Sequence, residues 1–289
     1  MADVAISCIT AVLLLVPLAW KWELDWRIVL AWAAAAGIAA GGLLLAISSV
    51  YPLSRPAFVV WDVVLILAAS AAALLARFYR RTERHPPAGR DLIVSPADGR
   101  IKYLHAVGEG EIPVSAKGRE RLPLSPPLSG MVTGRGGYLV GIAMSYLDEH
   151  VTRAPIGGKV THLQRIPGKF LSLKRKEAVW RNERLISVIE DGDRKVGLIH
   201  IASRLVRRIE SYVRAGDLLH TGQTIGMIRF GSQVDVVIPG GLEPEFRVRI
   251  GQRVNAGVSI IAAIRADNKE SVYGVCRETR GGKEVLPGK

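Results

Sequence analysis

The sequence predicts a mainly β body behind an α-helical N-terminal membrane region. Three observations support this prediction: long apolar stretches before residue 80, a cluster of arginines directly after them, and short strands of alternating apolar residues from residue 91 onward. Alternation is typical of half-buried strands, whereas uncharged runs of about 20 residues can cross a bilayer. We therefore expect membrane-anchoring helices over residues 1–80, a linker over 81–90 and a folded domain over 91–289.

The apolar stretches cover residues 5–20, 28–50 and 57–76. The first is short for a full span, so whether it crosses the bilayer or lies in the interface is left open. Basic clusters beside a span remain on the cytoplasmic side, and the third stretch is followed by Arg77, Arg80, Arg81 and Arg84. We expect an inner (cell) membrane protein whose folded domain faces the cytoplasm.

The charge balance points to an anionic partner. Net charge is +13 although 49% of the residues are hydrophobic. Apolar segments favour an acidic membrane surface as that partner, and the chain lacks the aromatic-and-basic motif of nucleic-acid binding. Its two cysteines, Cys8 and Cys276, provide neither a disulfide framework nor a metal-ligand cluster, so we expect no metal.

Strands are expected over 91–94, 100–107, 137–143, 159–165, 187–191 and 196–201. An internal repeat follows, in which Val213–Gly222 and Val248–Gly257 share glycine spacing. These halves resemble the duplicated β-barrel or sandwich of biotinyl and lipoyl carrier domains. Such domains carry their cofactor on a lysine between the halves, and the segment between these halves has no lysine. A carrier role is therefore disfavoured.

The segment between the halves does contain Gly231-Ser232, ahead of an alternating strand. Glycine has no side chain to shield its carbonyl, so the next hydroxyl can approach closely. With a base nearby, Ser232 could attack the carbonyl of Gly231, convert the amide to an ester and eliminate. The new N-terminus would be a pyruvoyl group, a ketone that forms Schiff bases and acts as an electron sink. Alone, a Gly-Ser pair is far more typical of an ordinary turn.

Further motifs accompany this pair, and their order resembles that in phosphatidylserine decarboxylases, particularly the short bacterial and archaeal type. The resemblance covers Phe78 to Ile264 and rests on Phe78–Arg80, Ser95–Gly99, Met144–Pro155, Gly168–Leu171, Asn182–Arg184 and Phe230–Ser232. It implies a pyruvoyl-dependent, self-cleaving membrane enzyme that converts phosphatidylserine to phosphatidylethanolamine. Cleavage would give a β chain (1–231) and an α chain (232–289) that stay associated.

The resemblance and the residue chemistry together suggest catalytic roles. His150 is the natural base for Ser232, because its reference pKa lies near neutrality, and Asp98 could orient the imidazole. Longer-type relatives place a second histidine where this chain has Arg153, which cannot act as a base. Either His150 serves both self-cleavage and decarboxylation, or another histidine such as His200 contributes. Candidate substrate contacts are Arg153, Lys169 and His200.

Two other functions stay open. An archaetidylserine-type decarboxylase would use the same headgroup on a different lipid tail. A noncatalytic, membrane-stalked biotinyl-like carrier or adaptor would keep its chain intact. Homo-oligomerisation is left open.

Overall fold

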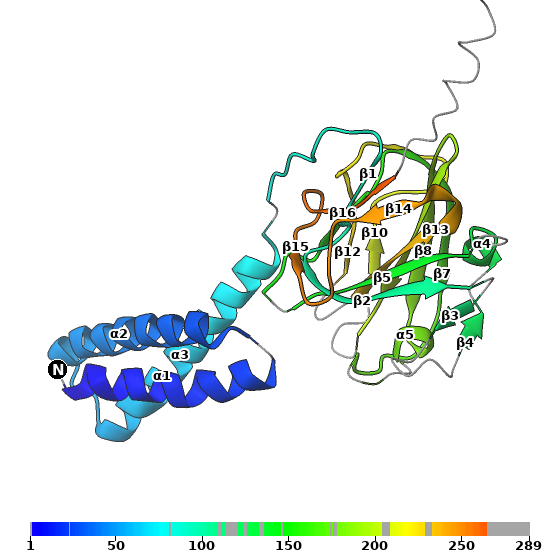
Figure 1. The fold of residues 1–289 in the computed structure, drawn as a ribbon. Helices are drawn as coiled ribbons and strands as arrows, with labels where there is room; N and C mark the ends of the chain where they lie inside the picture. Colours follow the sequence, from blue (N-terminus) through cyan, green and yellow to red (C-terminus); the bar gives the residue numbers. More distant parts are fainter. Residues whose placement is uncertain are drawn as a thin grey trace, which may run out of the picture.

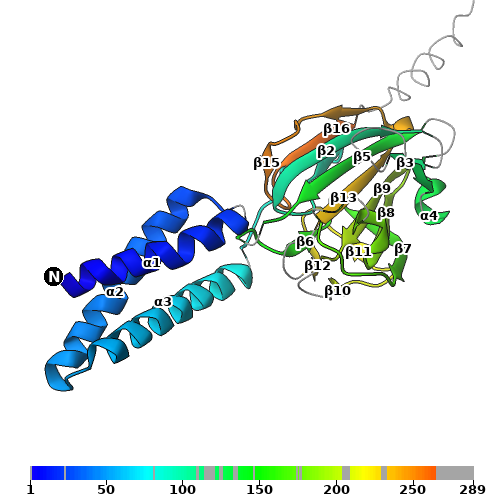
Figure 2. The same cartoon turned by 90° about the horizontal axis from the view of Figure 1, so that it is seen from below.

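The computed structural model describes residues 2–22, 24–80, 82–108, 111–113, 121–123, 126–132, 136–145, 147–173, 175, 178–203, 209–228 and 233–264. In this part of the chain, three long helices extend away from one side of a β-rich body (Figures 1 and 2). This arrangement confirms the predicted fold class.

The N-terminal helices are α1 (Ala2–Lys21), α2 (Trp26–Val50) and α3 (Arg55–Phe78). By length and composition each could cross a membrane, with mean hydropathies of 2.2, 2.2 and 2.4. The Asp25 side chain caps α2 by accepting a hydrogen bond from the Arg27 amide at 3.0 Å. Close packing of α1 on α2 requires Gly37, where a Cβ would lie 2.6 Å from the Cα of Cys8. The first apolar stretch is thus a full-length helix packed against the second.

The body consists of one long sheet, two three-stranded sheets and a small hairpin. The long sheet has the order β11 (Leu218–Leu219), β7 (Gly158–Ile166), β8 (Arg184–Asp191), β9 (Arg194–Ile201), β13 (Gln233–Pro239), β5 (Gly137–Ala143), β2 (Gly99–Val107), β15 (Arg253–Val254). The three-stranded sheets are β1 (Leu92–Val94), β16 (Ile260–Ile264), β14 (Pro244–Phe246), and β10 (Ile209–Ser211), β12 (Thr224–Ile228), β6 (Val151–Arg153). The hairpin is β3 (Glu111–Pro113) with β4 (Arg121–Pro123), and the short helices are α4 (Pro126–Ser129), α5 (Ala178–Arg181) and the 3-10 turn η1 (Gly240–Leu242).

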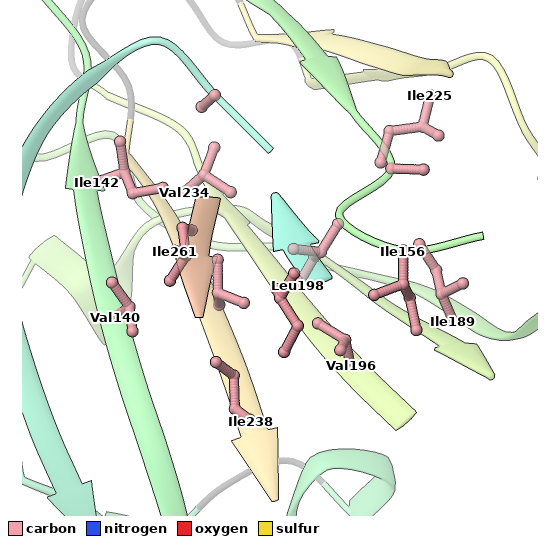
Figure 3. Packing of buried hydrophobic residues seen from close by; sticks show 14 of the residues in the cluster. Val140, Ile142, Ile156, Ile189, Val196, Leu198, Ile225, Val234, Ile238 and Ile261 are labelled. Carbon is pink, nitrogen blue, oxygen red and sulfur yellow. The ribbon is translucent and has the colours of Figure 1, made fainter. Parts of the chain in front are cut away.

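The main core lies between the long sheet and the two smaller sheets (Figure 3). Val234 and Leu198 project from the long sheet into the same cluster as Ile225 of β12 and Ile261 of β16. Side chains alternate along a strand, so the intervening residues of β13 point to the opposite face. There Val237 packs in a second cluster that includes residues of α4, β8 and β9.

The body is duplicated, as the glycine repeat predicts. The amide of Gly216 donates to the Val160 carbonyl at 2.7 Å, and the amide of Gly251 donates to the Ile101 carbonyl at 2.7 Å. Each repeat then adds a short strand to the long sheet, β11 beside β7 and β15 beside β2. The paired three-stranded sheets complete the symmetry. The two halves therefore form one sandwich related by an approximate two-fold axis.

Gly141, in the middle of β5, is a testable packing constraint. It pairs with both Tyr103 and Asp235, and a Cβ at this position would lie 2.4 Å from the Tyr103 ring. We expect Gly141→Ala to displace the ring and lower stability by about 1–3 kcal/mol, the usual cost of overpacking. Thermal unfolding of the purified full-length protein measures the loss. Gly108→Ala, where a Cβ meets open space, is the matched control; equal melting temperatures for the two variants would contradict the prediction.

Candidate active site

The sequence motifs converge on one end of the long sheet. Six adjacent strands bring paired residues into a row there, in the order Ile166, Arg184, Ile201, Gln233, Ala143 and Arg100. The Met144–Pro155 and Gly168–Leu171 motifs follow the row directly, and Ser95–Gly99 and Asn182–Arg184 end at or just before it. Gly231 and Ser232 lie outside the described residues. Ser232 is joined covalently to Gln233, which sits near the middle of the row.

His150 is fully buried beside this row, at the residue before β6. Its Nδ1 lies 2.8 Å from the backbone oxygen of Asp148. A carbonyl oxygen can only accept, so Nδ1 carries the proton and Nε2 is the basic atom. The ring packs against Phe78, the last residue of α3, with centroids 4.3 Å apart. Burial lowers the pKa of His150 to about 4 although neighbouring acids oppose the shift, so the imidazole is neutral at physiological pH.

Asp98 is also buried, but its main partner is Arg84 rather than the imidazole. Arg84 binds both carboxylate oxygens, at 2.5 and 2.8 Å, and the Ala256 amide donates to the same group at 2.7 Å. Burial alone would raise the pKa of Asp98, but Arg84 and the backbone amides outweigh it and hold the pKa below its usual value. The orienting bond expected from Asp98 is therefore made by the Asp148 carbonyl, and Asp98 acts on His150 through its charge.

Arg153 occupies an internal position. Its guanidinium donates to the carbonyls of Thr82, at 2.7 Å, and Gly222, at 3.2 Å, and lies 3.5 Å from the Glu149 carboxylate. Only 8% of the residue is exposed. These contacts brace the linker and the site motif against each other, so the expected contact of Arg153 with substrate stays a prediction.

The polar loop and the Asn182–Arg184 motif are joined by one buried amide. The Asn182 side chain accepts from the Leu171 amide at 2.7 Å and donates to the carbonyls of Leu171 and Ala202, both at 2.8 Å. Lys169 is exposed and forms a backbone bridge to Asn182. The lysine therefore lies at the site end of the sheet with its side chain toward solvent.

His200 lies inside the sandwich. It faces a small cavity that is also lined by Ser187, Glu210 and Ile225. Its Nδ1 is 3.4 Å from the Leu185 carbonyl, and its buried Nε2 has no hydrogen-bond partner among the described residues. Burial lowers its pKa to about 4. The structure thus places His200 on β9, one residue before the row, and its proposed role with substrate stays a prediction.

A buried polar cluster follows the expected cleavage point. Tyr103 donates to Asp235 at 2.6 Å, and the Gln233 amide donates to both residues at 2.6 and 2.7 Å. Burial raises the pKa of Asp235 to about 6, and burial and Asp235 raise the pKa of Tyr103. This cluster fixes the first residues of β13 against β2.

Sequence reasoning missed two components of this region. Arg84 was attributed to the membrane-flanking basic cluster, and nothing local distinguishes a buried arginine from an exposed one. Asp235 was detectable, because an acid within the apolar run Val234–Ile238 is typical of a buried, hydrogen-bonded carboxyl.

Arg184 in the row is half-buried, its Nε has no partner among the described residues, and burial lowers its pKa.

Fold and site together define a duplicated β-sandwich with three candidate membrane-spanning helices and a buried histidine at the end of its long sheet. A family model described as phosphatidylserine decarboxylase matches residues 71–262. The chain belongs to the phosphatidylserine decarboxylase family.

Relatives in archaea and bacteria agree with this membership. A Methanocaldococcus jannaschii protein that carries the archaetidylserine decarboxylase proenzyme name is 38% identical over 192 residues, 66% of this chain and 90% of that protein. The phosphatidylserine decarboxylase proenzyme of Erythrobacter litoralis is 35% identical over 232 residues, 77% of this chain and 84% of its own length. The phosphatidylserine decarboxylase proenzyme of Mycobacterium leprae is 36% identical over a match that covers 68% of this chain and 72% of that protein.

The raised pKa of Asp235 makes stability depend on pH. The folded state holds this proton more tightly than the unfolded chain, so the group's contribution to stability is full below pH 4 and is lost as pH rises through about 6. Asp235→Asn has no such loss. We expect its stability relative to the unmodified protein to increase by about 2–3 kcal/mol between pH 4 and pH 7, since one pKa unit is about 1.4 kcal/mol.

Thermal unfolding across this pH range measures the difference. Asp193→Asn, at an exposed carboxylate in the turn between β8 and β9, controls for the loss of a charge. A stability difference for Asp235→Asn that is constant with pH would contradict the prediction.

Proposed function

We propose that this protein decarboxylates phosphatidylserine to phosphatidylethanolamine with a pyruvoyl group, which it makes by cleaving itself between Gly231 and Ser232. The observation that carries the proposal is a neutral, buried imidazole at the end of the sheet where the motifs meet and where Gln233, the residue after Ser232, is held. Family membership and relatives named as decarboxylase proenzymes support it.

In the proposed self-cleavage, Nε2 of His150 takes the proton of the Ser232 hydroxyl. The oxygen then attacks the Gly231 carbonyl carbon, and the acyl group moves from the Ser232 nitrogen to its oxygen. Loss of the Cα proton breaks the ester's Cβ–O bond and leaves a carboxylate on Gly231. The remaining enamine takes up water and loses ammonia, which leaves the ketone. A serine hydroxyl needs such a base because it is a weak nucleophile at its own pKa.

The neutral, buried imidazole of His150 supports chemistry on a pyruvoyl group. When formed, this group supplies a carbonyl electron sink for the electrons released with carbon dioxide. At Nε2, His150 would take the proton that the substrate ammonium gives up and return it to the product carbon, since its Nδ1–H is already bound to the Asp148 carbonyl. Asp98 would stabilise the transient imidazolium by its charge.

The site would lie at the membrane surface. The last residue of α3 contacts His150, so no long spacer separates a candidate span from the site. We propose that the body faces the cytoplasm, because Arg77 lies in the last turn of this helix and Arg80 follows it closely. The charged serine headgroup would then reach the site from the interface while the lipid tails stay in the bilayer.

An archaetidylserine-type substrate is the second candidate. The Methanocaldococcus jannaschii relative carries this name and shares 38% identity with the chain. The two lipids share the serine headgroup, so the same His150 chemistry serves both.

Arg184 is the cation in the row that we propose for headgroup recognition. It is half-buried, and its Nε has no partner among the described residues. A desolvated guanidinium without a carboxylate partner suits an external phosphate or carboxylate. In contrast, Arg153 is already bound to Thr82, Gly222 and Glu149.

Intact-mass spectrometry tests self-cleavage directly. We expect the purified protein to contain a fragment ending at Gly231 and a 58-residue fragment, residues 232–289, whose N-terminus is a pyruvoyl group. Ser232→Ala lacks the attacking oxygen and should remain a 31.3 kDa chain without decarboxylase activity. His150→Ala should also remain uncleaved, because the base is lost. An unbroken mature chain that releases carbon dioxide from phosphatidylserine would reject the pyruvoyl proposal.

The headgroup role of Arg184 predicts a kinetic effect. Arg184→Gln should raise KM for phosphatidylserine in vesicles by about tenfold or more, because a charge-assisted hydrogen bond contributes roughly 1.5–3 kcal/mol. Self-cleavage should persist. Lys195→Gln, at the opposite end of the β8–β9 pair, is the control. An unchanged KM in Arg184→Gln would remove Arg184 from headgroup binding.

A further inference from the structure

The end of α3 and the segment after it contact the candidate site before β1, the first strand of the body, begins. Besides the Phe78 ring on His150, the Nε of Arg77 donates to the Leu147 carbonyl at 3.1 Å. The Thr82 amide donates to the Glu149 carboxylate at 3.2 Å. These contacts fix the segment following α3 against the loop that carries His150.

Arg84 extends from this segment into a buried charge cluster. Its side chain is 9% exposed, while that of Glu149 is fully buried. The guanidinium holds Asp98 by two bonds, binds Glu149 at 2.7 Å and donates to the Ala256 carbonyl at 2.9 Å. Such a fork binds two carboxylates and a carbonyl at once, which a lysine cannot reproduce.

The cluster is balanced in charge. Asp98 and Glu149 face two cations, Arg84 from the linker and Arg153 from β6. Asp148, whose carbonyl holds the imidazole, is separately paired with Arg253. Without Arg84, two buried carboxylates would share a single cation whose nearest contact is 3.5 Å.

We propose that Arg84 is a positioning residue for the reaction: from the linker, it neutralises and orients Asp98 and Glu149 beside His150, so the site is complete only when the membrane-exit segment is docked. The inference rests on the proposed self-cleavage. It assigns to the linker a role in the chemistry of the site, in addition to joining the membrane region to the body.

The physical consequence is a change in the basicity of His150. Asp98 and Asp148 act on the imidazole through their charges. The groups paired with these acids or with one another are Glu149, Arg84, Arg153 and Arg253. Loss of Arg84 leaves one uncompensated negative charge in this set, and a nearby anion stabilises an imidazolium. His150 would then be protonated at higher pH and would fail as a base in mildly acidic solution.

The pH profile of self-cleavage tests this role. Full-length precursor is synthesised without cells into phospholipid nanodiscs, moved to buffers from pH 5.5 to 8.5, and followed by denaturing gel. The wild-type rate should stay flat to pH 5.5, because the His150 pKa is about 4. For Arg84→Gln, the midpoint should rise by about two to three pH units, into the measured range. The midpoint for Arg84→Lys should lie between those of the wild type and of Arg84→Gln.

Arg90→Gln is the matched control, since Arg90 lies in the same linker but forms an exposed pair with Asp191. Its profile should equal the wild-type profile. A slower Arg84→Gln reaction with an unshifted midpoint would reduce Arg84 to a structural residue and overturn the proposal. A wild-type chain that is never cleaved would instead reject the proposed function.

A charge-balanced variant covers the case in which Arg84→Gln does not fold. Arg84→Gln with Glu149→Gln removes one cation and one anion, so the cluster regains its balance. We expect this double variant to be cleaved with the wild-type midpoint. A shifted midpoint would overturn the proposal.

Discussion

The ion pairs of Arg84 with Asp98 and Glu149 constrain much of the structure around them. Buried carboxylates are costly unless a cation and further hydrogen bonds compensate them, and removing one partner of such a pair typically costs several kcal/mol. Here the cation comes from the chain between α3 and β1, 14 residues before Asp98 in sequence. The linker therefore follows a fixed path across the body. The same path brings Phe78, at the end of α3, onto His150.

Three buried titratable groups in this part of the body differ in the direction and the cause of their pKa shifts. Asp98 receives a guanidinium and backbone amides, and its pKa falls. Asp235 receives only neutral donors from Tyr103 and Gln233, and its pKa rises to about 6. His150 gains a carbonyl acceptor at Nδ1, but desolvation dominates and lowers its pKa to about 4. For the two carboxyls, the partner supplied, more than the depth of burial, decides whether the pKa falls or rises.

Much of the fold could be predicted from local patterns. Apolar alternation located the principal strands, and the glycine spacing at Gly216 and Gly251 predicted the duplication, because the turns there require positive φ, 101° and 85°. The motif order also pointed to the residues around the site. Which buried polar groups bind each other could not be predicted from local patterns. That Arg84 binds Asp98, or that the Asp148 carbonyl takes Nδ1 of His150, depends on how separate segments meet in three dimensions.

The approximate symmetry of the body is broken where the candidate site lies. The Val94 amide donates to the Pro155 carbonyl, and the Arg153 amide donates to the Pro96 carbonyl, at 2.9 and 2.8 Å, so the two halves brace each other reciprocally. In this correspondence Asp98 occupies the position of Gly157 in the other half. A duplicated backbone thus supplies two equivalent turns, but only one carries a carboxylate that can bind a linker arginine. The acid at this turn, and the membrane-exit segment that it holds, distinguish the two halves of the scaffold at the candidate site.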